Sequence, residues 1–159
     1  MSFGEELIGI IWSDYLTFGL DHYALIITPS RIIGCKKRAL WKGLVVYLGP
    51  GSKATTADRE DAQKVLAKLM EAKDFEFPKD SIVKIVYRKP RLFSSGHLDI
   101  HTTGKGLELI IGFRAGNQGT LEALIPSLII FAADRFYDEK TGALVEAEIL
   151  HNVRGNDQN

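Results

Sequence analysis

The sequence predicts an α+β protein built from antiparallel strands and two main helices, and three observations indicate this fold class. Two apolar runs flank the turn-forming stretch 28–31 (Thr-Pro-Ser-Arg) and indicate a central hairpin. A second hairpin is indicated by strand-like segments on both sides of 104–106 (Gly-Lys-Gly). Two further segments, 55–73 and 120–137, repeat apolar residues at the spacing of a helix.

Seven segments have the composition and alternation of strands. In chain order they are residues 7–12, 24–28, 31–35, 41–48, 81–89, 97–102 and 107–113. The polar stretch 13–19 is interpreted as the connection between the first two strands. Gly and Pro residues at 49–52 end the fourth strand, because both residue types interrupt regular structure.

The first helix is predicted to begin at Thr55, because a threonine followed three residues later by an acid, Asp58, is a typical helix start. Its apolar stripe consists of Ala62, Val65, Leu66, Leu69 and Met70. The second helix, 120–137, is expected to kink or restart at Pro126, which lacks a backbone donor. Residues 143–150 fit either a short helix or a strand.

Composition places the chain among ordinary globular proteins. It has 159 residues, 45% of them apolar, and a formal net charge of zero, so we expect one domain at 1–150 and a polar, disordered tail at 151–159. Zero net charge gives no reason to expect a nucleic-acid partner. The single Cys35, the acidic N-terminal stretch and the absence of a long apolar run predict a soluble, cytoplasmic protein without a transmembrane segment.

Residues 23–35 (YALIITPSRIIGC) carry a strand, a short turn, an arginine and a second strand, and this pattern resembles the pleckstrin-homology (PH) superfold in its prokaryotic or GRAM-like variety. The apolar C-terminal helix resembles the helix that closes those folds. The resemblance covers roughly residues 5–137 and implies a bent antiparallel sheet, or partly open barrel, with one open end. It also implies that an anionic ligand would bind there, between the first–second and third–fourth strand loops. The predicted first loop departs from the lipid-binding members, because it has no Lys or Arg and carries Asp14.

The third–fourth loop is the remaining candidate at that end. It contains what we term the basic corner, which consists of Lys36, Lys37, Arg38 and Lys42. These cations suit charge-assisted hydrogen bonds to a phosphate or an anionic headgroup, and the neighbouring Trp41 suits stacking or a membrane interface. Residues 22–57 also contain no acid. A strand-to-strand corner that merely solvates its charges, with Trp41 packed in the core, explains the same residues.

A second candidate lies on the strand 97–102, where His97, Asp99 and His101 share one face because side chains alternate along a strand. Two imidazoles and a carboxylate are ligands of Zn²⁺ and similar ions and leave a position open for water. The same pattern is expected of an ordinary solvent-exposed strand face, since Leu98 and Ile100 supply the buried one. The sequence offers no Ser–His–Asp or Cys–His arrangement of a nucleophile and its base.

Together these observations predict a non-catalytic PH-like binding or scaffolding domain without a cofactor. Its expected partner is another protein, a second copy of itself or an anionic ligand, bound at the open end of the barrel or along an exposed strand edge. The alternative is a small metal-binding protein or metal-dependent enzyme that uses the face of His97, Asp99 and His101.

Trp41 separates the two interpretations of the basic corner. It shares an uncharged strand face with Gly43, Val45 and Tyr47, whereas Lys42 begins the opposite face, so alternation predicts that the Trp41 face is buried. Trp41→Ala should then cost about 3–5 kcal/mol in free energy of unfolding, measured with urea, because it truncates a large core aromatic. A cost within about 0.5 kcal/mol together with impaired binding would indicate a surface role.

Overall fold

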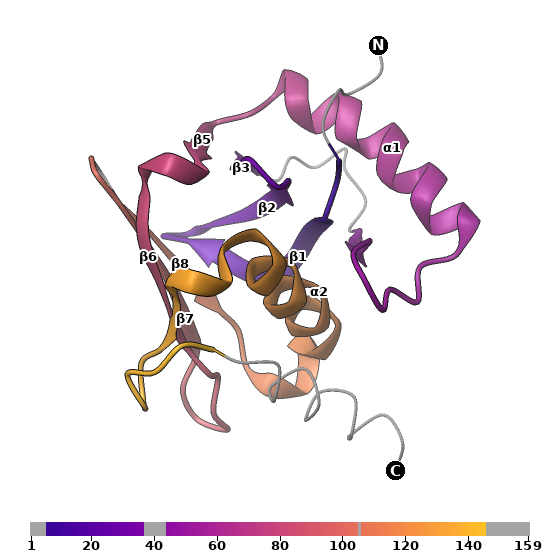
Figure 1. The fold of residues 1–159 in the computed structure, drawn as a ribbon. Coiled ribbons are helices and arrows are strands. Elements are labelled where there is room, and N and C mark those ends of the chain that lie inside the picture. The colour runs from indigo at the N-terminus through magenta and orange to yellow at the C-terminus, as the bar shows by residue number, and fades with distance from the viewer. Residues whose placement is uncertain (1–5, 37–43, 105, 146–159) are drawn as a thin grey trace.

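The computed structural model describes residues 6–36, 44–104 and 106–145 of the chain. Within these ranges the protein is a mixed α+β fold, mostly sheet, with nine strands in one open sheet and two α-helices (Figure 1). The strands are β1 (Gly9–Phe18), β2 (Asp21–Ile27), β3 (Arg31–Lys36), β4 (Val45–Tyr47), β5 (Phe75–Pro78), β6 (Ile82–Arg88), β7 (Gly96–Thr102), β8 (Leu107–Ile111) and β9 (Phe136–Asp138). The helices are α1 (Thr56–Glu71) and α2 (Arg114–Ala132), with short 3₁₀ segments at Lys79–Ser81 and Ala133–Arg135.

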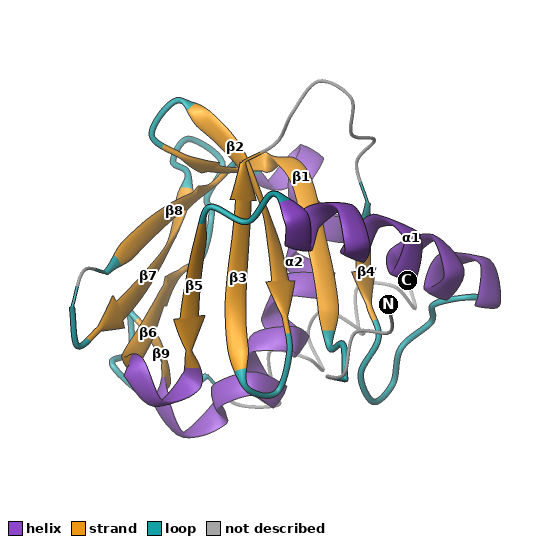
Figure 2. Ribbon diagram, turned by 90° about the horizontal axis from the view of Figure 1, so that it is seen from above, coloured by secondary structure: helices purple, strands orange, loops and turns teal. Residues whose placement is uncertain are grey.

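The strands are arranged in the order β5-β3-β2-β1-β8-β7-β6-β9, and β4 pairs with β1 beside this path. All neighbouring strands are antiparallel except β6 and β9, which are parallel. The sheet bends so that β1, β2, β3 and β5 form one wall and β6 to β9 the other (Figure 2). The predicted antiparallel sheet with two main helices is therefore confirmed, with nine strands rather than about seven.

The turn between β2 and β3 forms where it was predicted. The amide of Thr28 donates to the carbonyl oxygen of Arg31 at 3.0 Å, which closes the turn. The Thr28 hydroxyl oxygen also accepts hydrogen bonds from the amides of Ser30 and Arg31. Pro29 presets the first corner and has no amide that would need a partner. The central hairpin is thus specified by residues that lie next to one another in the chain.

Both faces of β1, β2 and β3 are buried over 9–13, 24–27 and 32–35, which explains the unbroken apolar runs of this region. One face carries Ile26 and Ile33 and packs against the apolar stripe of α1. The other face carries Leu25 and Ile27 and shares a core with α2 and with the opposite wall. Figure 1 shows α1 outside the bend of the sheet and α2 within it.

The start of α1 is confirmed in detail. The Thr55 hydroxyl accepts a hydrogen bond from the Asp58 amide at 3.1 Å, and the Asp58 carboxylate accepts one from the Thr55 amide at 2.9 Å. This reciprocal pair satisfies two amides that a helix start leaves without partners. Ala62, Leu66 and Leu69 are buried, as the predicted stripe requires. The helix ends at Glu71, close to the predicted limit.

The second helix differs from the prediction at both ends. α2 begins at Arg114, earlier than the predicted residue 120, and ends at Ala132, so the predicted helical end at 137 is wrong. Gly116 and Gly119 in its first turns have low helix propensity, which hid the start, and tertiary packing overrides that preference. Pro126 lies inside α2 without ending it, so the expected restart does not occur.

The predicted connection at 13–19 is also wrong, because β1 continues through it to Phe18. The turn to β2 consists of Gly19 and Leu20. Gly19 adopts a φ of 63°, a left-handed conformation that glycine tolerates without steric cost. The first loop at this end of the sheet is therefore two residues with no charge, and Asp14 belongs to a strand.

β4 covers only Val45–Tyr47 of the predicted strand 41–48, and Trp41 and Lys42 lie outside the described residues. Val46 is buried on the α1 side of the sheet, whereas Val45 and Tyr47 pack partly against the core that contains α2. The prediction of one buried and one outward face is therefore wrong for β4, because helices cover both of its faces.

Two strands were not predicted, β5 and β9, and both are short. β5 pairs with β3, and β9 pairs with β6. Residues 143–145 extend beside β9, since the Val145 amide donates to the Phe136 carbonyl oxygen at 2.7 Å. The rest of the ambiguous segment, 146–150, and the predicted tail, 151–159, lie outside the described residues.

Gly34 provides the space that lets β5 pack on β3. It lies opposite Phe75 in the β3–β5 pair, and the phenyl ring covers the glycine. A Cβ atom at position 34 would lie 1.8 Å from the Cζ atom of Phe75. Ring contacts then continue from Phe75 to Phe77 at 5.2 Å and to Tyr23 at 5.8 Å between centroids.

We therefore expect Gly34→Ala to lower the free energy of unfolding by about 1–3 kcal/mol, because the added methyl group displaces the Phe75 ring. Urea unfolding measures the change. Gly104→Ala is the matched control, since a Cβ there meets nothing within 4 Å, and it should stay within about 0.5 kcal/mol of the wild type. In the Phe75→Leu background the cost of Gly34→Ala should shrink; an unchanged cost would contradict this account.

Candidate functional site

The basic corner is described only at its first residue. Three of its members lie outside the described residues: Lys37, Arg38 and Lys42. Lys36 ends β3 and is exposed, with its Nζ 3.3 Å from the Asp21 carboxylate. Its amide donates to the Asp74 carboxylate at 2.6 Å. The fold thus brings two acids to the first residue of the basic corner, inside a stretch, 22–57, that has none of its own.

The other candidate residues share one face of β7, as predicted. His97 and Asp99 are partly buried and His101 is exposed, on the side of the strand opposite the buried Leu98 and Ile100. Each faces a residue of a neighbouring strand across the sheet. This face therefore lies outside the core, and α1 and α2 pack elsewhere on the sheet.

Glu108 of β8 joins this group, and the sequence pattern did not predict it. It pairs directly with Asp99 in the antiparallel register, and its Oε1 lies 3.2 Å from the Nδ1 of His97. Burial raises the pKa of Asp99, and the charge and hydrogen bonding of Glu108 raise it further, whereas His101 and His97 act in the opposite direction. The Oδ1 atom of Asp99 is buried without a hydrogen-bond partner. Only the strand register reveals this pair of carboxyl groups.

The geometry offers no coordination site to the metal-binding alternative. Within 6–36, 44–104 and 106–145, no group of three or more His, Cys, Asp and Glu side chains is placed to hold a metal ion. His97, Asp99 and His101 succeed one another along an extended strand, where alternate residues lie well apart. Chemically, the face offers a carboxyl group that takes up a proton more readily than an ordinary exposed Asp, beside an imidazole.

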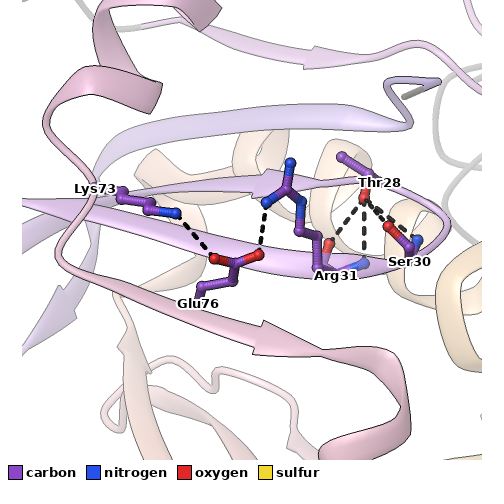
Figure 3. A network of polar contacts seen from close by, with 5 residues as sticks. All are labelled: Thr28, Ser30, Arg31, Lys73 and Glu76. Atoms are coloured by element: carbon purple, nitrogen blue, oxygen red, sulfur yellow. Dashed lines mark hydrogen bonds and ion pairs between the residues drawn. The ribbon is translucent and has the colours of Figure 1, made fainter. Parts of the chain in front are cut away.

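Arg31, the arginine of the 23–35 pattern, binds within the protein. Figure 3 shows the Glu76 carboxylate between two cations, with Arg31 Nη1 at 2.6 Å and Lys73 Nζ at 3.0 Å. The hydrogen bonds from Arg31 and Lys73 lower the pKa of Glu76. This network ties β5 to β3, so Arg31 has a structural role.

Apolar residues at the tip of the loop between β6 and β7 are the feature that the sequence pattern missed. Leu92 is 76% exposed and Phe93 is 90% exposed. Arg91 and Ser94 close the tip with two backbone hydrogen bonds, at 2.8 and 3.3 Å. The signal in the sequence is a Leu-Phe pair in a turn, where polar residues are the rule.

Comparison with known proteins adds no relative. No protein-family model matches the chain, and neither the curated proteins nor the solved structures give a match. In the part of the chain that is described, neither helix combines the length and the hydrophobicity that crossing a membrane would require.

The carboxyl pair on β7 and β8 predicts a pH-dependent stability. Because the pKa of Asp99 is raised in the folded state, the stability that its protonated form contributes is present at low pH and is lost as the pH rises through that pKa. Asp99→Asn removes this loss and should raise the free energy of unfolding at pH 7 by about 0.2–1 kcal/mol, the size of a typical interaction between side chains paired across two strands.

Urea unfolding at pH 4 and pH 7 measures the effect, and the gain should shrink at the lower pH. Asp80→Asn, at an exposed position, is the control and should be neutral at both values. If Asp99→Asn and the wild type were equally stable at pH 7, the Glu108 carboxylate would not destabilise the ionised form of Asp99.

Proposed function

We propose that the chain is a non-catalytic PH-like binding or scaffolding domain. The observation that carries the proposal is the enclosure of α2, the helix that follows β8, within a bent and open sheet that is mostly antiparallel. This is the arrangement that the resemblance of residues 23–35 and of the C-terminal helix to the PH superfold implies. A helix that fills the inside of the bend leaves the strand edges and the loops at the ends of the sheet for binding.

The polar groups of the interior support a structural rather than a catalytic use. The buried Thr120 hydroxyl donates to the Ser13 hydroxyl at 2.7 Å, and the buried Ser127 hydroxyl donates to the Ala123 carbonyl oxygen at 2.6 Å. The first bond joins α2 to β1, and the second joins successive turns of α2.

The proposed partner is a protein, a second copy of the chain or an anionic ligand. The edges and ends of the sheet favour the first two, because an exposed edge can pair with another strand. Pro78 at the end of β5 limits pairing there, since it lacks an amide. For an anion, the four cations of the basic corner are the expected contacts.

The anion-binding form of the proposal predicts that the wild type binds inositol trisphosphate, a soluble phosphorylated headgroup, in isothermal titration calorimetry. The joint change Lys36→Ala, Lys37→Ala and Arg38→Ala should abolish the binding. The wild-type affinity should also fall with added salt, because exposed charges are screened over about 8 Å at physiological ionic strength. Light scattering across a range of protein concentrations tests self-association in parallel.

One combination of results would favour the metal-binding alternative. The protein would neither self-associate nor bind the anion, but it would bind Zn²⁺ stoichiometrically, and His97→Ala and His101→Ala would each abolish that binding. For this measurement the protein must be purified without a histidine tag.

A further inference from the structure

The loop between β6 and β7 presents two large apolar side chains in a fixed geometry. Leu92 and Phe93 occupy the two tip positions between Arg91 and Ser94, whose backbones hydrogen bond to each other in both directions. The tip is therefore a closed turn rather than a loose loop. With exposed fractions of 76% and 90%, neither side chain packs against the protein to any large extent.

A third exposed apolar side chain leaves the sheet at the same end. Gly96, the first residue of β7, pairs with Ile111, the last residue of β8. The loop that enters β7 and the link that leaves β8 therefore start from the same level of the sheet. Phe113 in that link is 51% exposed. In Figure 1 the loop between β6 and β7 lies at the lower end of that wall.

Cations surround the base of this tip. Residues 82–98 contain no acid, and Arg88, Lys89 and Arg91 lie immediately before the Leu-Phe pair. The Arg88 guanidinium donates to the Ser95 carbonyl oxygen at 3.2 Å, which holds its charge at the base of the loop. The turn after β9 lies beside it, because the Glu139 amide donates to the Tyr87 carbonyl oxygen at 2.8 Å.

That neighbouring turn carries charges of both signs. It contributes two acids, Asp138 and Glu139, and one cation, Lys140. Counted with the three cations of the loop, the region keeps an excess of positive charge. Its apolar tip is therefore bordered by a surface that attracts anions.

We propose that this end of the sheet docks on an anionic lipid bilayer, with Leu92 and Phe93 inserted into the interface and Arg88, Lys89 and Arg91 at the headgroups. The inference rests on the proposed function, in that it names the partner of a binding domain. Apolar and aromatic side chains favour the membrane interface, and cations beside them favour anionic lipids.

The shape of the tip favours a bilayer over a folded protein partner. A stable protein interface buries about 800 Å² on each partner, with some 20–30 residues a side. A two-residue tip on a narrow hairpin is much smaller than that, but it suits insertion between lipid headgroups. Each cation near an anionic surface strengthens binding about fivefold, so three of them, with a short apolar tip, make a weak and salt-sensitive attachment.

Co-sedimentation with lipid vesicles tests the proposal. The wild type at 50 mM salt should bind vesicles of phosphatidylcholine and phosphatidylserine in a 7:3 ratio, and should bind pure phosphatidylcholine at least tenfold more weakly. The joint change Leu92→Ser and Phe93→Ser should weaken binding at least tenfold. Leu20→Ser is the matched control, because Leu20 is fully exposed on the turn between β1 and β2, and it should bind as the wild type does.

The charges are tested separately from the apolar tip. Lys89→Gln together with Arg91→Gln changes two exposed residues and should remove most of the preference for phosphatidylserine, as should raising the salt to 500 mM. All these positions are on the surface, so the variants should keep the wild-type urea midpoint. That measurement excludes unfolding as the cause of lost binding.

Insertion itself has a spectroscopic readout. An environment-sensitive fluorophore on Phe93→Cys should shift to shorter wavelength on anionic vesicles, whereas the same fluorophore on Leu20→Cys should not; the native Cys35 is buried and should not be labelled. Wild-type protein that ignores anionic vesicles at 50 mM salt would overturn the proposal. The proposal would also be overturned if the Leu92→Ser, Phe93→Ser variant bound the vesicles as tightly as the wild type does.

Other results would assign the tip to another partner or leave the proposed function intact. A dimer in light scattering that the Leu92→Ser, Phe93→Ser change disrupts, without vesicle binding, would make the tip a self-contact and overturn the membrane assignment. Binding of inositol trisphosphate through the basic corner without vesicle binding would overturn this inference alone. If the protein binds vesicles but neither binds inositol trisphosphate nor self-associates, then anion binding at the basic corner and self-association are removed from the proposed function.

Discussion

The bend of β1 is the constraint on which the rest of the structure depends. β1 pairs with β2 on both sides of the bend, with β4 before it and with β8 after it, and its register to β2 shifts between Trp12 and Thr17. The buried hydrogen bond from Thr120 to Ser13 holds α2 against this bend. Losing one partner of such a pair would leave a buried hydroxyl unsatisfied, at a cost of about 1–3 kcal/mol. Because β1 joins the two walls through its pairing with β8, a change there would displace both, whereas α1 covers only an outer face.

The same constraint decides where the protein can bind anything. α2 occupies the inside of the bend and α1 covers the outside of β1 to β3, so both faces of this wall are covered over 9–13, 24–27 and 32–35. In the described part of the chain, the outer face of β7 and β8, with His97, Asp99 and Glu108, and the ends of the sheet carry the exposed chemistry. The two ends differ in kind. Lys36 meets Asp21 at one, whereas cations border an exposed apolar tip at the other.

Interactions between residues close in sequence were predictable, and those between distant residues were not. The Thr28 turn and the Thr55 capping box each join residues three apart, so the hairpin and the start of α1 could be placed from the sequence. The second half of β1 could not, because its polar residues gain partners from β8 and α2, which lie far along the chain. β5 is stabilised by the fit of Phe75 over Gly34, and no local pattern announces such a fit. The early turns of α2 form against their own glycine content for the same reason.

In the candidate sites, too, the contacts between residues close in sequence were predictable and those between distant residues were not. The alternation of His97, Asp99 and His101 places them on one face, but Glu108 reaches Asp99 only through the register of β8. Asp21 and Asp74 likewise meet Lys36 only in the folded chain. Leu7 and Leu92 show most directly that burial cannot be predicted from the local sequence alone. Both are leucines outside regular strands, yet Leu7 is 9% exposed and packs on the α1 side, whereas Leu92 is 76% exposed. What buries one and not the other is the set of neighbours that distant parts of the chain supply. An apolar residue in a loop therefore becomes a candidate binding residue only once the fold shows that nothing in the protein covers it.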